Sequence, residues 1–111
     1  MNITEITPSY SVSPQITVGD VATIAEKGFN SIMCNRPNGE DPGQTDVEEI
    51  RAEAERLGLT FAFVPVVSGS ITPENVIEFK DELAKLPTPV FAYCRSGGRC
   101  QNLWLLAGNA R

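Results

Sequence analysis

The sequence predicts an α/β fold with a mostly parallel, four- to five-stranded sheet and helices on both faces. Apolar runs of strand length alternate along the chain with segments of helical spacing, and proline or glycine separates most of them. The chain has 111 residues, which is enough for one domain with a real hydrophobic core but too few for two. Strands that alternate with helices form parallel sheets that are buried on both faces.

Each expected strand is a short apolar run bounded by residues that end strands. Pro8 and Pro14 limit the first two runs to short strands or a hairpin. The later runs are apolar almost throughout, which is typical of strands covered on both faces. The expected strands span residues 3–6, 10–12, 29–35, 59–67 and 87–93.

The expected helices begin at capping residues, and glycine ends two of them. Thr17 precedes the first helix, a capping-box pattern at 45–48 opens the second, and Thr72-Pro73 starts the third. Gly28 and Gly58 follow the first two helices, as glycine commonly does. The expected helices span residues 18–27, 45–57, 73–86 and 102–107, with loops at 36–44 and 68–70.

The last strand leads into the most informative segment, Tyr93 to Cys100, which reads YCRSGGRC. A turn that joins a strand to a helix N-terminus presents several backbone N–H groups to one point and so favours an anion. Arg95 and Arg99 add positive charge, and Gly97-Gly98 let the backbone turn tightly. We therefore expect Cys94 to ionise near neutral pH and act as a nucleophile. The alternative is that Cys94 is simply a small buried hydrophobic residue.

The chain contains no histidine, which narrows the chemistry. Cys–His and Ser–His pairs and most zinc sites are excluded, so we expect no metal and no cofactor. Ser96 has no base to activate it, and it is expected to orient the loop or to bind the anion. The turn itself must activate the thiolate. Cysteine-dependent phosphate-ester hydrolysis and sulfur transfer through a persulfide are the two reactions that fit.

Composition excludes several partners and suggests a compartment. The net charge of −5 gives no footprint for nucleic acid or for an anionic membrane, and no apolar run reaches membrane-spanning length. The first residues do not resemble a secretory signal. Three cysteines, an odd number, argue against a disulfide scaffold and fit a reducing environment. We therefore predict a cytoplasmic protein.

Two features favour sulfur transfer over phosphate hydrolysis. Four residues separate Cys94 from Arg99, where cysteine-dependent phosphatases have five, and a tighter loop leaves less room for phosphate. Hydrolysis also needs a carboxylic acid near the leaving oxygen. The loop around Ser68 has no carboxylate, although Glu40 or Asp41 can substitute from the other long loop. Sulfur transfer needs no acid, because its leaving group is already an anion.

Arg36 follows the end of another expected strand, in the turn that reads Asn-Arg-Pro. It can face the same cleft as the cysteine turn, or it can form a surface salt bridge.

Three segments, at residues 35–40, 64–72 and 93–99, resemble the phosphatase-like domain of beta-lactamase-hydrolase-like proteins. The last segment is also similar to the active-site loop of rhodaneses. The resemblance implies the fold of dual-specificity cysteine phosphatases. In the family that the sequence resembles, the domain occurs alone or fused to a metallo-beta-lactamase-like persulfide dioxygenase, so the resemblance implies such a dioxygenase as a possible partner. It implies either a nonclassical phosphatase or a rhodanese-like sulfurtransferase that supplies a persulfide to such a neighbour.

The sequence departs from the family pattern at Gly98, where threonine is common, and at Cys100, where serine is common. The second change removes a hydroxyl that helps the cysteine to leave in related phosphatases, which weighs further against hydrolysis.

The leading prediction is therefore a sulfurtransferase. Cys94 attacks the outer sulfur of thiosulfate or a similar donor, Arg99 and the loop amides stabilise the leaving anion, and a small thiol such as glutathione removes the persulfide. A cysteine-dependent phosphatase acting through a cysteinyl phosphate is the alternative. A non-catalytic module that binds an oxyanion, or senses oxidants through Cys94 and Cys100, is a third. The residues expected to bind the anion are Arg95, Ser96, Gly97, Gly98 and Cys100.

Residues 1–111 are expected to form a single domain, either minimal or excised from a longer fusion protein.

Overall fold

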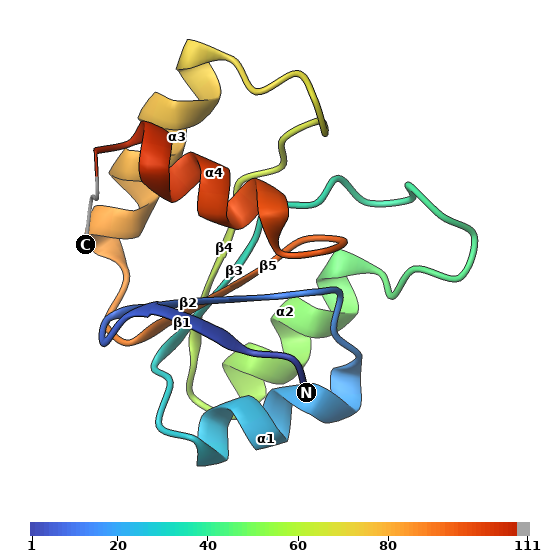
Figure 1. Ribbon diagram of the computed structural model, residues 1–111. Coiled ribbons are helices and arrows are strands. Elements are labelled where there is room, and N and C mark those ends of the chain that lie inside the picture. The colour runs from blue at the N-terminus through green and yellow to red at the C-terminus, as the bar shows by residue number, and fades with distance from the viewer. Residues whose placement is uncertain (109–111) are drawn as a thin grey trace.

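The computed structural model describes residues 1–108 and confirms the predicted α/β fold (Figure 1). Strands and helices alternate along the chain after an N-terminal hairpin. The elements in chain order are β1 Thr4–Thr7, β2 Tyr10–Ser13, α1 Val18–Glu26, β3 Ser31–Cys34, α2 Val47–Arg56, β4 Thr60–Phe63, α3 Pro73–Lys85, β5 Val90–Tyr93 and α4 Gly98–Leu106.

The five strands form one sheet in the order β1-β2-β5-β3-β4. Only β1 runs antiparallel to its neighbour, and the other pairs are parallel. Tyr93, the last residue of β5, lies opposite Ser13 of β2 and Cys34 of β3, and Cys34 in turn lies opposite Phe63 of β4. The four parallel strands therefore end at one edge of the sheet, where α/β proteins bind their ligands.

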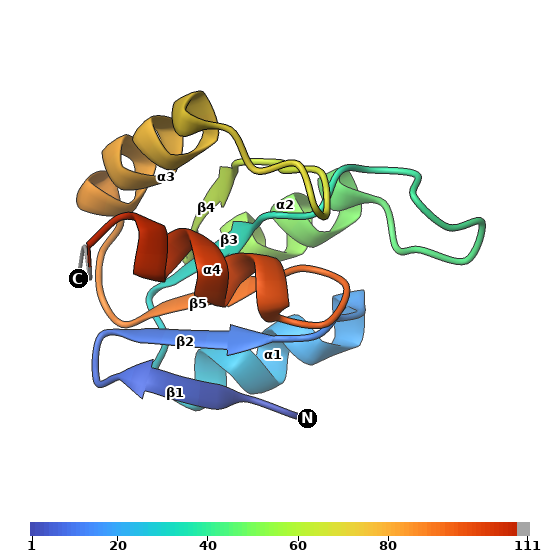
Figure 2. The ribbon, with the colours of Figure 1, turned by 45° about the horizontal axis from the view of Figure 1, so that its top comes forward.

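Helices cover both faces of the sheet, α1 and α2 on one face and α3 and α4 on the other (Figures 1 and 2). Each pair of helices buries an apolar stripe against the strands, which gives two hydrophobic clusters. The buried helical residues of the α1–α2 side are Val21, Ile24, Val47, Ile50 and Ala54, and those of the α3–α4 side include Phe79, Leu83, Leu103 and Trp104.

Two boundaries near the cysteine turn differ from the sequence prediction. β4 ends at Phe63 instead of residue 67, because Pro65 has no N–H for the ladder. The chain still follows β3 there, since the amide of Val66 donates to the carbonyl of Asn35 at 3.0 Å. α4 begins at Gly98, four residues earlier than expected, so the helix N-terminus lies directly beside the cysteine turn.

The second helix also begins differently from the predicted capping box at 45–48. Its N-cap is Asp46, whose carboxylate accepts a hydrogen bond from the amide of Glu48 at 2.8 Å. None of the helices within residues 1–108 has the length and apolar character needed to cross a bilayer.

Replacement of Phe79 tests the α3–α4 side of the core. This ring is fully buried and packs edge-on against Tyr10, with 6.1 Å between the ring centroids. The substitution Phe79→Ala should lower the free energy of unfolding by about 3–5 kcal/mol, because it leaves a cavity as well as removing apolar contacts. Ile77→Ala, on the exposed side of the same helix, should change it by less than about 1 kcal/mol. Urea unfolding of both variants measures the difference, and equal effects would contradict this packing.

Candidate active site

The cysteine loop, residues 94–99, is tied to the strand beside it. The amide of Cys94 donates to the carbonyl of Ser13, and the amide of Gln15 donates to the carbonyl of Arg95, both at 3.3 Å. Gly97 lies in the left-handed region, with φ of 93°, and a Cβ there would stand 3.4 Å from the backbone of Ser13. Glycine is therefore required at 97 both for its conformation and for the close approach of two segments.

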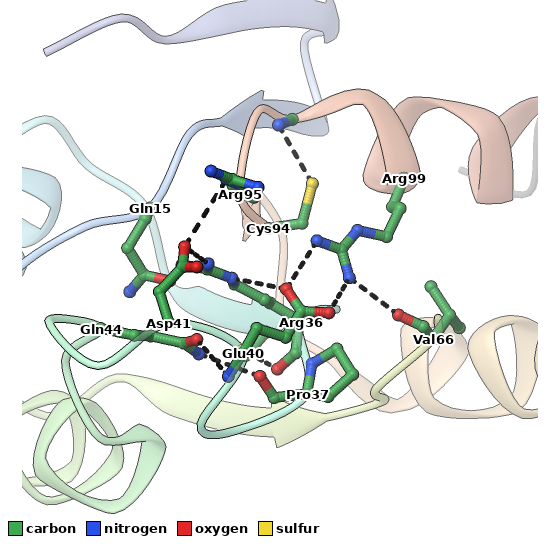
Figure 3. Close-up of polar contacts among 12 residues, drawn as sticks. Gln15, Arg36, Pro37, Glu40, Asp41, Gln44, Val66, Cys94, Arg95 and Arg99 are labelled. Carbon is green, nitrogen blue, oxygen red and sulfur yellow. Dashed lines mark hydrogen bonds and ion pairs between the residues drawn. The ribbon is translucent and has the colours of Figure 1, made fainter. Parts of the chain in front are cut away.

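The Cys94 side chain is fully buried, but its sulfur is directed at the loop. The amide of Gly97 donates to Sγ at 3.0 Å (Figure 3). The largest effect on this thiol is a hydrogen bond from the Cys100 side chain, with further bonds from the amides of Cys100, Ser96 and Arg99. Burial opposes ionisation, yet these donors prevail and lower the pKa of Cys94 to about 5. The sulfur is thus a thiolate at neutral pH.

Cys100 supplies a hydrogen-bond donor to the Cys94 sulfur, although it lacks the hydroxyl of the serine that is common at this position. Burial raises the pKa of its thiol well above the ordinary value, and the neighbouring Cys94 sulfur raises it further, so Cys100 stays protonated and donates. A thiol therefore takes the position where serine is common. Cys34 is also buried, and its Sγ donates to the carbonyl of Arg36 at 3.3 Å, which gives it a structural role in the turn.

Two arginines converge on one carboxylate beside the loop (Figure 3). Nη1 and Nη2 of Arg99 donate to the two oxygens of Glu40 at 2.8 and 2.9 Å, and Nη1 also donates to the carbonyl of Val66 at 3.0 Å. Nε of Arg36 donates to Glu40 at 2.8 Å. Bonding to Arg99, with a smaller part from Arg36, lowers the pKa of Glu40 to about 2. Glu40 is therefore ionised at neutral pH.

Arg36 lies behind the pocket and does not face it. Its side chain is only 3% exposed, and Nη1 and Nη2 donate to Gln15 at 3.0 Å and to Asp41 at 2.7 Å. The sequence allows either a place in the cleft or a surface salt bridge for this residue. The structure has neither, because Arg36 is a buried cation that holds Glu40 and Asp41 in place.

A pocket of about 490 Å³ opens over the cysteine loop at the edge where the parallel strands end. The loops after β3, β4 and β5 and the first turn of α4 all contribute to its wall. The lining residues are Glu40, Asp41, Ser68, Gly69, Ile71, Arg95, Ser96, Gly98, Arg99 and Asn102. Most of the site residues predicted from the sequence therefore line this pocket. Cys94 and Cys100 are buried beneath it, and Gly97 lines a second, smaller pocket on another side of the loop.

The polar residues on the pocket wall differ in how firmly they are held. Arg99 is buried and fixed by its ion pair, with 8% of its side chain exposed. Arg95 is mostly exposed, and its Nε lies 3.7 Å from Asp41. Ser96 Oγ accepts a hydrogen bond from the amide of Gly98 at 3.2 Å, which stabilises the turn. Ser68 lies across the pocket on the connection between β4 and α3.

Sequence reasoning missed Gln15 and Asn102. The backbone amide of Gln15 donates to the cysteine loop, and its side-chain oxygen accepts a hydrogen bond from Arg36. No local sequence pattern predicts either contact. Asn102 lies four residues after Gly98 on α4, so the spacing of a helix face could have found it once the helix start was known. Residues 1–108 contain no group of three or more histidine, cysteine, aspartate or glutamate side chains placed to hold a metal ion.

Comparison with known proteins confirms the resemblance stated from the sequence. The sequence model of a family described as beta-lactamase hydrolase-like protein, phosphatase-like domain, matches residues 2–110. A curated beta-lactamase hydrolase-like protein from Agrobacterium fabrum is 31% identical over 106 residues, which make up 96% of this chain and 25% of that protein. The chain spans about a quarter of the length of the curated relatives it matches.

Solved structures agree with the fold. A candidate phosphatase from Neisseria meningitidis is 37% identical, with a TM-score of 0.86 over 94% of this chain and 74% of that one. The core catalytic domain of the PP-IP phosphatase SIW14 from S. cerevisiae has a TM-score of 0.67 at 15% identity, over 87% of this chain and 57% of that one. At that identity the second likeness concerns the fold alone, which is the cysteine-phosphatase fold.

The prediction of sulfur transfer is wrong. The matching family and the 37% identical structure are both described as phosphatase-like, and neither is described as rhodanese-like. Two of the arguments behind the prediction also fail on the geometry. The replacement of serine by Cys100 does not remove a donor to Cys94, because the Cys100 thiol donates instead. Carboxylates also reach the pocket, from the loop after β3. The thiosulfate donor and the glutathione acceptor were expected only with that reaction, and the comparisons support neither of them nor the dioxygenase partner that the resemblance implies.

Replacement of Cys100 tests the donor to the sulfur. Cys100→Ala removes the largest effect that stabilises the thiolate and should raise the pKa of Cys94 from about 5. Cys100→Ser keeps a donor, and its Cys94 pKa should lie closer to that of the unchanged protein. Thiolate absorbance as a function of pH measures both variants, with Cys94→Ser as the blank. An unchanged Cys94 pKa in Cys100→Ala would show that the amides alone hold the anion.

Proposed function

Because the chain belongs to the family of phosphatase-like domains of beta-lactamase hydrolase-like proteins, we propose that it is a cysteine-dependent phosphatase. The observation that carries the proposal is the ionised sulfur of Cys94 at the centre of a loop of amides, beside a fixed guanidinium. A thiolate is a nucleophile, and amides with an arginine are the groups that bind phosphoryl oxygens. The substrate class is a phosphate monoester small enough for the pocket over the loop.

The first chemical step transfers the phosphoryl group to Cys94. The thiolate attacks phosphorus, an S–P bond forms and the P–O bond to the leaving alcohol breaks. Arg99 and the amides of the loop stabilise the charge on the phosphoryl oxygens. In the second step water attacks phosphorus, the S–P bond breaks and inorganic phosphate leaves. The hydrogen bonds to Sγ favour this step, because they stabilise the departing thiolate.

Access to the sulfur sets a requirement on the loop. Cys94 is fully buried, and the Gly97 amide lies on its sulfur at 3.0 Å. A phosphoryl group reaches the sulfur only if the peptides of the loop move outward. Their N–H groups would then donate hydrogen bonds to the phosphoryl oxygens instead of to the sulfur. Gly97 and Gly98 permit this movement, because glycine has few steric limits on its backbone angles.

Asp41 is the acid of this proposal. The leaving oxygen needs a proton, and two carboxylates line the described pocket, Glu40 and Asp41. Glu40 is excluded by its pKa of about 2, since it holds no proton to give at neutral pH. Asp41 is 46% exposed, and its described ion pairs with Arg36 and Arg95 both involve Oδ2, which leaves Oδ1 to meet a substrate. It donates its proton to the leaving oxygen and takes one back from the attacking water, which balances the reaction.

Replacement of the nucleophile tests the reaction itself. Cys94→Ser should lower the turnover of para-nitrophenyl phosphate by about a thousandfold or more, because a hydroxyl stays protonated where the thiol ionises. Acid quenching of the unchanged protein during turnover should leave a phosphoryl group on Cys94, detected by mass spectrometry. Activity that persists in the serine variant, or a label on another residue, would refute the proposal.

Replacement of Asp41 tests the assignment of the acid. Asp41→Asn should lower kcat by about 100-fold for an alkyl phosphate and much less for para-nitrophenyl phosphate, whose leaving group needs no proton. For the unchanged protein, kcat/KM should rise with pH through about 5 as Cys94 loses its proton. The variant should keep this rise, because Cys94 is unchanged in it. Glu48→Gln, on the exposed face of α2, is the matched control.

An equal loss for both leaving groups in Asp41→Asn would show that Asp41 is not the acid.

A further inference from the structure

The guanidinium of Arg99 is held along one of its two edges. Its described hydrogen bonds use Nη1 twice and Nη2 once, toward Glu40 and the Val66 carbonyl. Within residues 1–108 this leaves Nε and the second Nη2 hydrogen, which together form the other edge of the fork. An arginine edge of two parallel N–H groups is the group that binds two oxygens of a phosphate side by side.

Glu40 is held from two sides and cannot easily turn away from Arg99. One of its oxygens accepts from both arginines, at 2.8 Å from Arg36 Nε and 2.9 Å from Arg99 Nη2. Its backbone amide donates to Gln44 at 2.9 Å, and the amide group of Gln44 donates to the carbonyl of Pro37 at 2.9 Å. Hydrogen bonds within the loop after β3 therefore stabilise its conformation and hold Glu40 beside Arg99 (Figure 3).

The charges around Glu40 are balanced. Arg36 and Arg99 both contact this one carboxylate, and Arg36 is also paired with Asp41. An incoming dianion therefore meets a carboxylate whose charge is already compensated by two guanidinium groups. The electrostatic repulsion between the dianion and Glu40 is reduced for this reason. Glu40 is better placed to orient a cation than to repel a substrate.

We infer that Glu40 is a positioning residue for phosphoryl transfer, which fixes the plane of Arg99 so that its Nε–Nη2 edge is presented to the phosphoryl oxygens. This inference rests on the proposed phosphatase function. It assigns to Glu40 a role other than the acid role considered from the sequence. Arg99 acts on the substrate, and Glu40 acts through Arg99.

The substitution Glu40→Gln tests this role, because it keeps the size of the side chain and removes its charge. One of the two Arg99 donors would then face an amide N–H₂ group, so the guanidinium loses its fixed orientation. We expect the affinity for inorganic phosphate, measured by calorimetry, to fall by about tenfold or more. We expect kcat/KM to fall by a similar factor for alkyl and for para-nitrophenyl phosphate. Glu53→Gln, whose carboxylate pairs with Arg56 on α2, is the matched control.

A double-mutant cycle separates positioning from a general structural effect. In an Arg99→Lys background there is no guanidinium plane to orient, so adding Glu40→Gln should cost much less than it does alone. Equal costs in both backgrounds would overturn the inference. So would phosphate affinity that is unchanged or raised in Glu40→Gln, or a loss of rate confined to the alkyl phosphate. Phosphate binding needs no turnover, so it tests this role even if the proposed phosphatase activity fails.

Discussion

An ionised sulfur below the protein surface is the constraint on which the rest of the site depends. Burial alone would raise the pKa of Cys94, so the surroundings must supply enough donors to reverse that effect. Backbone N–H groups can supply these donors because they do not titrate near neutral pH and remain after any substitution except proline. Their convergence needs the left-handed Gly97 and a helix that begins at Gly98, so that unpaired amides of the first turn meet the sulfur. Cys100 adds a donor from one turn further on.

The fold places three other segments around that sulfur, which follow β2, β3 and β4. β5 lies between β2 and β3 in the sheet, so the cysteine loop emerges beside both the chain that follows β2 and the loop that follows β3. The first holds the cysteine loop through Ser13 and Gln15, and the second brings Glu40 and Asp41. The connection after β4 closes the pocket at Ser68. The cysteine loop thus forms the floor of the site and the other loops form its wall, and the ion pair between Arg99 and Glu40 joins the two.

Local patterns revealed most of the fold and the centre of the site. Apolar runs and capping residues predicted every strand and helix, and the glycines and arginines after Cys94 predicted an anion-binding turn. Three things depended on tertiary structure and were missed. Gly97 approaches the backbone of Ser13 just before α4 begins, and Gln15 meets Arg36 only through the sheet. Glu40 is ionised because Arg99, 59 residues further along the chain, binds it together with Arg36. The reaction was predicted wrongly because the sequence did not show that the Cys100 thiol can replace a serine hydroxyl as the hydrogen-bond donor to Cys94.

Direct titration of the Cys94 thiol in the folded protein tests the account most sharply. Selective carbon-13 labelling of the cysteines resolves the Cβ signals of Cys34, Cys94 and Cys100, and only the signal of an ionising thiol moves with pH. We predict that the Cys94 signal titrates near pH 5 while those of the other two stay constant through neutral pH. A Cys94 signal that begins to move only above neutral pH would mean that the loop holds a thiol, and the proposed nucleophile would be lost.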